Sequence, residues 1–332
     1  MSGSTAPATG TSSPGQVWRP GSLEVLTALL VLLVIGQRWL IGLFDSPAAA
    51  AFATIFVSIV VQALPFLVLG VVLSGAIAAF VPVSFWQRAL PRNQALAVPV
   101  AGCAGVVLPG CECASVPVSA SLISRGVAPA AALTFLLSAP AINPIVIVST
   151  FVAFPNNHEM ALARFVASLV TAVLMGWLWL RFGKGEWLRT PRRDHLVGHS
   201  NWHTFRLTAT HDFLHAGGFL VVGGLTAAAL NVIVPRSWLE AVADKPLLSV
   251  LALAGLAVLL SICSEADAFV AASLTEFSLT ARLAFLVVGP MVDIKLIALQ
   301  TGTFGRRFAS RFAPTTFLVA VVVSLLVGGW LL

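Results

Sequence analysis

The feature that most constrains this chain is a series of apolar runs long enough to cross a lipid bilayer. A membrane-spanning helix needs about 20 consecutive apolar residues. Runs of this kind occupy residues 24–44, 51–81, 128–151, 160–182, 213–235, 281–303 and 312–332. Hydrophobic residues make up 58% of the chain and charged residues only 10%, which excludes a soluble globular domain. We therefore expect an all-α integral membrane protein with about seven transmembrane helices.

Two further apolar stretches, 95–125 and 247–277, are interrupted near the middle. We interpret each as a re-entrant hairpin. An arm of about 15 residues reaches roughly 22 Å at 1.5 Å per residue, which passes the midplane of a hydrocarbon core about 30 Å thick. The chain would then return to the side from which it entered.

The basic residues support this topology. The segment 183–212 is rich in arginine and histidine and should be cytoplasmic by the positive-inside rule. With two hairpins, the other basic loops fall on the same side: Arg88, Arg92, Arg125, Arg306, Arg307 and Arg311. We therefore expect a multi-pass protein of a bacterial inner membrane with a cytoplasmic N-terminus. The formal charge of +6 then reflects topology, and no nucleic-acid partner is expected.

The chain also repeats itself, which predicts an inverted repeat. Three pairs of segments align in the same order: 66–82 with 219–235, 111–122 with 263–274, and 135–143 with 285–293. Three crossings in each repeat would place the second repeat upside down relative to the first, a common plan of secondary transporters. The expected parts are a disordered tail (1–22), a first transmembrane helix (23–50), repeat 1 (51–182), the cytoplasmic loop (183–212) and repeat 2 (213–332).

The residues that carry chemistry fall at the breaks. The first hairpin tip reads PGCEC (109–113), and the second reads CSEAD (263–267). Proline-broken helices follow at SAPAINP (138–144) and GPMVDIK (289–295). The candidate substrate site is therefore Cys111, Glu112, Cys113, Asn143, Cys263, Glu265, Asp267, Asp293 and Lys295.

Charged side chains at membrane depth cost about 2.5–3.5 kcal/mol each on insertion scales, so they indicate a substrate or ion pathway. The alternative is that Asp293 and Lys295 lie nearer an interface or pair with other charges. Thiolates beside carboxylates suit a soft metal or a thiophilic metalloid better than magnesium or calcium. Cys103, in AGCAG, is interpreted as a small packing residue outside this site.

A second candidate metal site lies in and after the basic loop. His195, His199, His203, His211 and His215 are spaced by four, four, eight and four residues. In a helix, neighbours four apart share a face, as ligands of helical zinc sites do. The alternative is a basic connector lying on the anionic inner leaflet.

The run GCECASVPVSASLISRGVAPAAALTFLLSAPAINPIVIVST resembles the signature of a bacterial predicted-permease family that includes the organoarsenical efflux permeases. The resemblance covers roughly residues 50–330 and implies a polytopic inner-membrane permease, with trivalent arsenical efflux for some members. It also makes Cys111, Cys113 and Cys263 the positions of a thiol-based substrate site.

These observations predict a permease for a thiophilic metal or metalloid, either a transition-metal ion such as zinc or a trivalent arsenical, and not an enzyme. We expect no cofactor beyond a transition-metal ion as substrate. The expected partners are the lipid bilayer and a small inorganic or organometalloid substrate; a second copy or an accessory protein is left open. The rival is a membrane thiol oxidoreductase using Cys111 and Cys113, although CxC differs from the redox CxxC motif. A passive channel is a third reading, disfavoured by the charged hairpin tips.

Overall fold

The computed structural model of the chain describes residues 47–107, 111–189, 200–233 and 245–332. Residues 51–332 form one compact unit. The tail and the first transmembrane helix, predicted at 1–22 and 23–50, therefore lie almost entirely outside the described residues.

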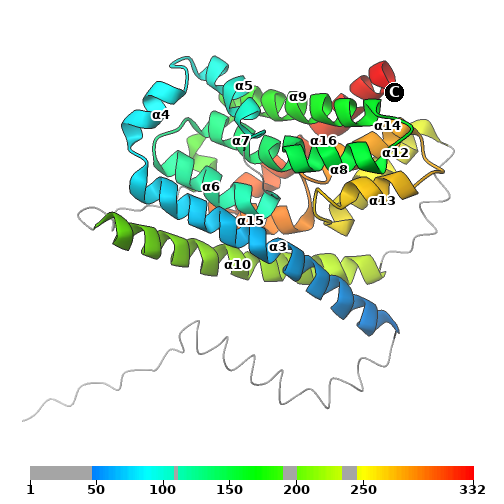
Figure 1. Ribbon diagram of the computed structural model, residues 1–332, viewed down its shortest axis with the longest axis horizontal. Helices are drawn as coiled ribbons and strands as arrows, with labels where there is room; N and C mark the ends of the chain where they lie inside the picture. The colour runs from blue at the N-terminus through cyan, green and yellow to red at the C-terminus, as the bar shows by residue number, and fades with distance from the viewer. Residues whose placement is uncertain (1–46, 108–110, 190–199, 234–244) are drawn as a thin grey trace, which may run out of the picture. The chain divides into compact units, whose positions relative to one another are not determined.

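Every regular element in the described ranges is helical (Figure 1). In the first half these are α3 (Pro47–Phe80), α4 (Val83–Ala89), α5 (Gln94–Ala104), α6 (Glu112–Ser124), α7 (Pro129–Ile142), α8 (Pro144–Ala153), α9 (Glu159–Phe182) and the 3₁₀ turn η1 (Gly185–Trp187). In the second half they are α10 (Asn201–Ile233), α12 (Pro246–Leu260), α13 (Asp267–Ser273), α14 (Leu279–Val288), α15 (Ile294–Phe304) and α16 (Arg306–Leu331). The all-α membrane fold is thus confirmed.

Among the described residues, five helical segments are long and apolar enough to cross a bilayer. They are Pro47–Phe80, Pro129–Ala153, Glu159–Phe182, Asn201–Ile233 and Arg306–Leu331. Each matches a predicted span. The span predicted at 281–303 is present as two shorter helices, α14 and α15, and the one at 24–44 lies outside the described residues. Helix α10 begins at Asn201, so it includes the last part of the predicted 183–212 loop.

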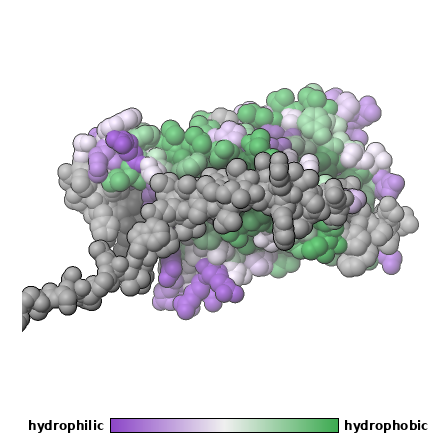
Figure 2. Space-filling model, turned by 90° about the horizontal axis from the view of Figure 1, so that it is seen from below, coloured by the Kyte–Doolittle hydropathy of each residue, from purple (hydrophilic) through white to green (hydrophobic). Residues whose placement is uncertain are grey.

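The outer helices carry apolar side chains on their exposed faces. On α3, Val57, Val61, Leu64, Val68 and Val72 are all exposed and recur at three- and four-residue intervals. This spacing places them on one face of the helix. On the coloured part of the surface in Figure 2, hydrophobic residues dominate the middle and hydrophilic residues gather toward the edges. An exposed apolar face of this length is expected where a helix contacts lipid.

The innermost elements are α6, α7 and the second half of α14. All of Glu112–Ile123 and Ala130–Ile142 is buried, as is Leu283–Val288. Helix α6 buries serines as well as apolar residues, and its mean composition is less apolar than that of α3. Polar groups are thus concentrated in the interior, away from the exposed apolar faces.

The order of elements in the second half matches that in the first. A long helix (α3 or α10) is followed by an interrupted pair (α5 and α6, or α12 and α13), a broken helix (α7 and α8, or α14 and α15) and a final long helix (α9 or α16). The halves also interlock, since α6 contacts α15 and α8 contacts α13 (Figure 1). The inversion of one half relative to the other stays a prediction.

The interrupted stretches form short helices, as hairpins require. Helices α5 and α6 have 11 and 13 residues, and α12 and α13 have 15 and 7. At 1.5 Å per residue the longest of them spans roughly 22 Å, short of a full crossing. The second arm of the second hairpin is shorter than the expected 15 or so residues. It ends early because a polar turn follows, in which the Ser278 side chain caps α14.

Candidate functional site

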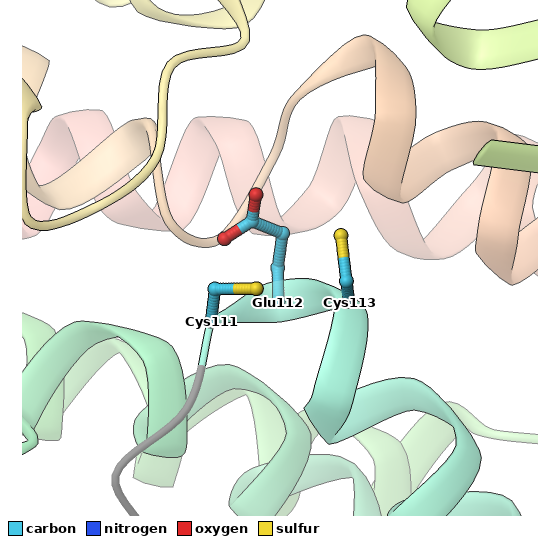
Figure 3. A group of neighbouring side chains, drawn as sticks. All are labelled: Cys111, Glu112 and Cys113. Atoms are coloured by element: carbon cyan, nitrogen blue, oxygen red, sulfur yellow. The ribbon is translucent and has the colours of Figure 1, made fainter. Parts of the chain in front are cut away.

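The first hairpin places three potential ligands at the start of α6. Cys111 is the N-cap residue, and Glu112 and Cys113 form the first turn. All three are at most 1% exposed, and one ligand atom from each lies within 4.8 Å of the others. Figure 3 shows the Glu112 carboxylate and the Cys113 sulfur pointing away from α6 in the same direction. A helix N-terminus stabilises negative charge, so it suits thiolates and a carboxylate.

The second hairpin brings its cysteine to the same place. The thiol of Cys111 interacts with the thiols of both Cys113 and Cys263. Cys263 also donates a hydrogen bond to Glu265 Oε2 at 2.7 Å. Cys263 of the second half is therefore a neighbour of Cys111 of the first half, and Cys113 adjoins Cys111 on the other side of Glu112. Cys103 lies apart from them and is exposed on α5, so the expectation that it is a packing residue is wrong.

Lys295 connects the first hairpin to the broken helix of the second half. Its Nζ donates to Glu112 Oε1 at 2.7 Å and lies 3.5 Å from Asp293 Oδ2. All three side chains are at most 3% exposed. Within a low-dielectric interior, such a set remains charged only if its members compensate one another. Lys295 is thus paired with Glu112 and Asp293, so the alternative that Asp293 and Lys295 pair with other charges applies. The pairing lies inside the predicted substrate site.

Asn143 and Asp293 hold the second arms of the two broken helices. The Asn143 side chain accepts a hydrogen bond from Val146 N at 3.0 Å, and that of Asp293 accepts one from Leu296 N at 2.6 Å. Each residue is thus the N-cap of the helix after a proline-associated break. Both are fully buried. They have equivalent structural roles at equivalent positions of the two halves, as the repeat predicts.

A turn in the second hairpin contacts this cap. Ser261 ends α12 in the left-handed region, with φ of 49°. Its hydroxyl accepts a hydrogen bond from Ile294 N at 3.2 Å, at the first residue of α15. A non-glycine residue in this conformation requires support from its surroundings. The interruption predicted in 247–277 is therefore fixed against the broken helix α14–α15.

Arg164 is the functional candidate that the sequence interpretation missed. It lies on α9, is fully buried, and donates to Asp267 Oδ2 at 2.9 Å and to Thr150 Oγ1 at 2.8 Å. It also donates to the backbone oxygen of Ser264 at 3.1 Å. One guanidinium therefore joins α8, α9 and the second hairpin. The signal was present in the sequence, because Arg164 is a charged residue inside a predicted span.

Several buried acceptors in this region have no hydrogen-bond partner among the described residues. They include Glu112 Oε2, Glu265 Oε1, Asp267 Oδ1 and Asp293 Oδ2. The hydroxyl of Ser264, between the two hairpin residues Cys263 and Glu265, is unpartnered as well. Buried polar atoms are normally satisfied, and unsatisfied ones call for a water, an ion or a ligand. The free oxygens therefore mark positions where a transported species could be coordinated.

The described members of the histidine series lie on α10 and not among the buried thiols and carboxylates. His195 and His199 lie outside the described residues. His203, His211 and His215 are on α10, where the rings of His211 and His215 stack with centroids 5.7 Å apart. The His211 side chain is 69% exposed. These two histidines share a helix face as expected from their spacing, and a metal role for the five stays a prediction.

Buried charges and thiols among bilayer-length helices define a class of protein: a multi-pass membrane transporter, not an enzyme. The comparisons with known proteins agree. The chain belongs to the family described as predicted permease, which matches residues 48–329. This membership decides against the thiol oxidoreductase considered above.

Two relatives cover most of the chain. The UPF0718 protein YcgR of Bacillus subtilis (strain 168) is 38% identical over 285 residues, which is 83% of this chain and 96% of that protein. A Streptococcus mutans protein, named as a subunit of a two-component membrane permease complex, is 33% identical over 283 residues, or 82% of this chain and 94% of its own length. No solved structure matches the chain.

Proposed function

We propose that this permease transports a thiophilic metal or metalloid species across a bacterial inner membrane. The substrate would bind between the two hairpin tips, at Cys111, Cys113 and Cys263. The single observation that supports this most directly is the position of the Cys263 thiol, from the second half, beside Cys111 of the first-half group Cys111, Glu112 and Cys113, next to carboxylate oxygens without hydrogen-bond partners among the described residues. Sulfur and carboxylate ligands together favour soft or borderline ions over magnesium and calcium.

The balance of charge favours a cationic form of the substrate. Four carboxylates line this region, those of Glu112, Glu265, Asp267 and Asp293. Two basic side chains, Lys295 and Arg164, compensate them. The formal excess of negative charge would be neutralised by a bound divalent cation or by a cationic metalloid species. An anionic oxyanion would instead add charge of the same sign to a buried region.

Lys295 gives the site a means of responding to the substrate. One oxygen of Glu112 is held by Lys295, and the other has no partner among the described residues. A cation binding at Cys111 and Cys113 would compete with the ammonium group for the carboxylate. Because Lys295 belongs to α15 and Glu112 to α6, this competition would weaken a contact between the halves. Alternating access requires such a contact to break and reform.

A partner chain is part of the proposal. One relative is named as a subunit of a two-component membrane permease complex. We extend this to the present chain and expect an accessory protein to assist transport, either by delivering the substrate or by contributing to its energy supply. The histidine segment, which begins in the basic loop and continues into α10, is the proposed place for a regulatory or delivery contact.

Cell metal content tests the proposed function. Cells with and without the gene would be loaded separately with zinc, cobalt, nickel, copper and arsenite, and the content of each element measured by mass spectrometry. We expect a change in at least one of these elements and none in magnesium or calcium. The Cys111→Ser variant should abolish the change, and Cys103→Ser should preserve it. Identical contents with and without the gene for every soft element would contradict the assignment.

A further inference from the structure

Helix α4 combines features of an element at a membrane surface. It follows the long span α3, has only seven residues, VSFWQRA, and carries Arg88 in its last turn. Phe85 is 53% exposed, and its ring contacts that of Trp86 edge-on. A short helix with an exposed phenylalanine, a half-buried tryptophan and a basic end is typical of the interface between lipid tails and headgroups.

An apolar pocket lies beside this helix. Its volume is about 340 Å³, and its lining side chains come from α3 to α7 and from adjoining turns. They include Leu73, Ile77, Leu122 and Phe135 together with Trp86. The lining residues carry almost no polar surface apart from the Trp86 indole. Such a pocket suits a hydrocarbon chain and offers no ligand for a metal ion.

A second pocket adjoins the first and is polar. It has a volume of about 520 Å³ and is lined by Ser84, Arg88, Arg92 and Gln94 among others. Trp86, Leu90 and Val127 line both pockets, so the apolar and the basic volumes meet at these residues. Arg88 and Arg92 are exposed, and the described residues provide neither with an acidic partner. The indole Nε1 of Trp86 is likewise without an acceptor in the described part of the chain.

We propose that this double pocket binds one anionic phospholipid. The headgroup phosphate would accept hydrogen bonds from Arg88 and Arg92, and an acyl chain would occupy the apolar pocket. Charge complementarity selects this occupant, because two unpaired guanidinium groups at a membrane surface attract an anionic headgroup. The apolar continuation distinguishes a lipid from free phosphate, which could fill only the basic half. Both volumes fall within the range of typical ligand pockets.

The test measures lipid-dependent stability. Delipidated protein in detergent would be melted with added dioleoyl phosphatidylglycerol, with dioleoyl phosphatidylcholine, or with inorganic phosphate. We expect phosphatidylglycerol to raise the melting temperature more than phosphatidylcholine does, and inorganic phosphate to have no effect. Native mass spectrometry should show one retained phosphatidylglycerol. An equal response to both lipids, or a full response to inorganic phosphate, would overturn the proposal.

Two variants separate the halves of the pocket. Arg88→Gln with Arg92→Gln should abolish the preference for phosphatidylglycerol and leave the melting temperature without lipid unchanged. Ala104→Trp should fill the apolar pocket from its exposed edge and reduce the response to both lipids. Arg306→Gln with Arg307→Gln, two exposed arginines at the start of α16, is the matched control and should keep the preference. If the Arg88 and Arg92 variant also keeps it, or if Ala104→Trp responds to both lipids as fully as wild type, the pocket is not a lipid site.

Discussion

Two buried ion pairs fix the residues at the hairpin tips. Glu112, at the start of α6, pairs with Lys295 at 2.7 Å, and Asp267, at the start of α13, pairs with Arg164 at 2.9 Å. In each pair the basic residue comes from an element outside that hairpin. Both pairs are almost completely buried, so removing one partner leaves a charge in a region that solvates it poorly. The tips are therefore held by interactions that are strong only as long as both partners are present.

The first prediction concerns Arg164. Arg164→Met should destabilise the protein by about 3–5 kcal/mol, the usual cost of breaking a buried pair. The double variant Arg164→Met with Asp267→Asn should recover a substantial part of this loss, because no charge remains uncompensated. The measurement is thermal or chemical unfolding in detergent. Arg181→Gln, an exposed arginine on the same helix, is the control and should change stability little. A double variant no more stable than the single one would contradict the pairing.

At this scale, the sequence identified the acids and thiols but not their partners. Cys111, Glu112 and Cys263 could be found because the repeat aligns the two hairpin tips and because charge is rare inside apolar runs. Arg164 was not identified, because an arginine near the end of a span can also extend its side chain to the membrane surface. Its partner Asp267 is 103 residues away, and no local pattern connects them. Pairing across the fold is a property of packing, which the sequence does not display.

The elements follow from apolar length and from proline. Runs of about 20 apolar residues became the long helices, and the breaks in the broken helices fall where SAPAINP and GPMVDIK predicted them. Asn143 and Asp293 explain why the breaks are well formed, since each caps the helix that restarts there. The start of α10 was harder to place. Its first turns are polar and contain histidine, so the sequence predicted a loop there. In the structure these residues are helical, and Trp202 stacks on Phe205.

The hairpins make a topological prediction. In a background with Cys103→Ser, single cysteines at positions 88–92, where α4 ends, and at positions 306–311, where α16 begins, should react with a membrane-impermeant thiol reagent only from the cytoplasmic side. A cysteine in place of Asn156 should react only from the outside. The reason is that each hairpin returns to its side of entry, which keeps the basic loops together. Labelling of positions 88–92 from outside would mean that 95–125 crosses the membrane completely.

The histidine segment makes a separate prediction. Replacing His195, His199 and His203 by Gln should alter the metal dependence of transport or its regulation while expression stays normal. Imidazole is a good ligand for zinc, copper and nickel, and the carboxamide of glutamine is a poor one. The measurement is uptake or efflux against metal concentration in cells expressing wild type or the triple variant. If transport depends on metal concentration in the same way in both proteins, the segment is only a connector on the membrane surface.

At the scale of the whole molecule, both halves contribute side chains to one buried cluster of thiols and charged groups. Helix α6 of the first half packs on α15 of the second, and α13 of the second packs on α8 of the first. The repeat visible in the sequence therefore has a structural counterpart in the order and contacts of the elements. The sequence also predicted that cysteines of both halves would meet, because elements related by a repeat converge at its axis. What the sequence could not supply was the connection of this cluster to Arg164 and Thr150.

The central claim is that thiols from both halves form one substrate site, and thermal stabilisation by a soft ion tests it most directly. A ligand that binds only the folded state stabilises it by about 2.7 kcal/mol at a hundred times its Kd. Purified protein would be melted with Zn²⁺ and with arsenite in separate titrations, alongside the Cys111→Ser, Cys263→Ser and Cys103→Ser variants. We predict that one of these species raises the melting temperature of wild type and Cys103→Ser. Cys111→Ser and Cys263→Ser should each lose the increase and melt normally without the ion. Full retention of the increase in both of these variants, or its absence in wild type, would contradict the account.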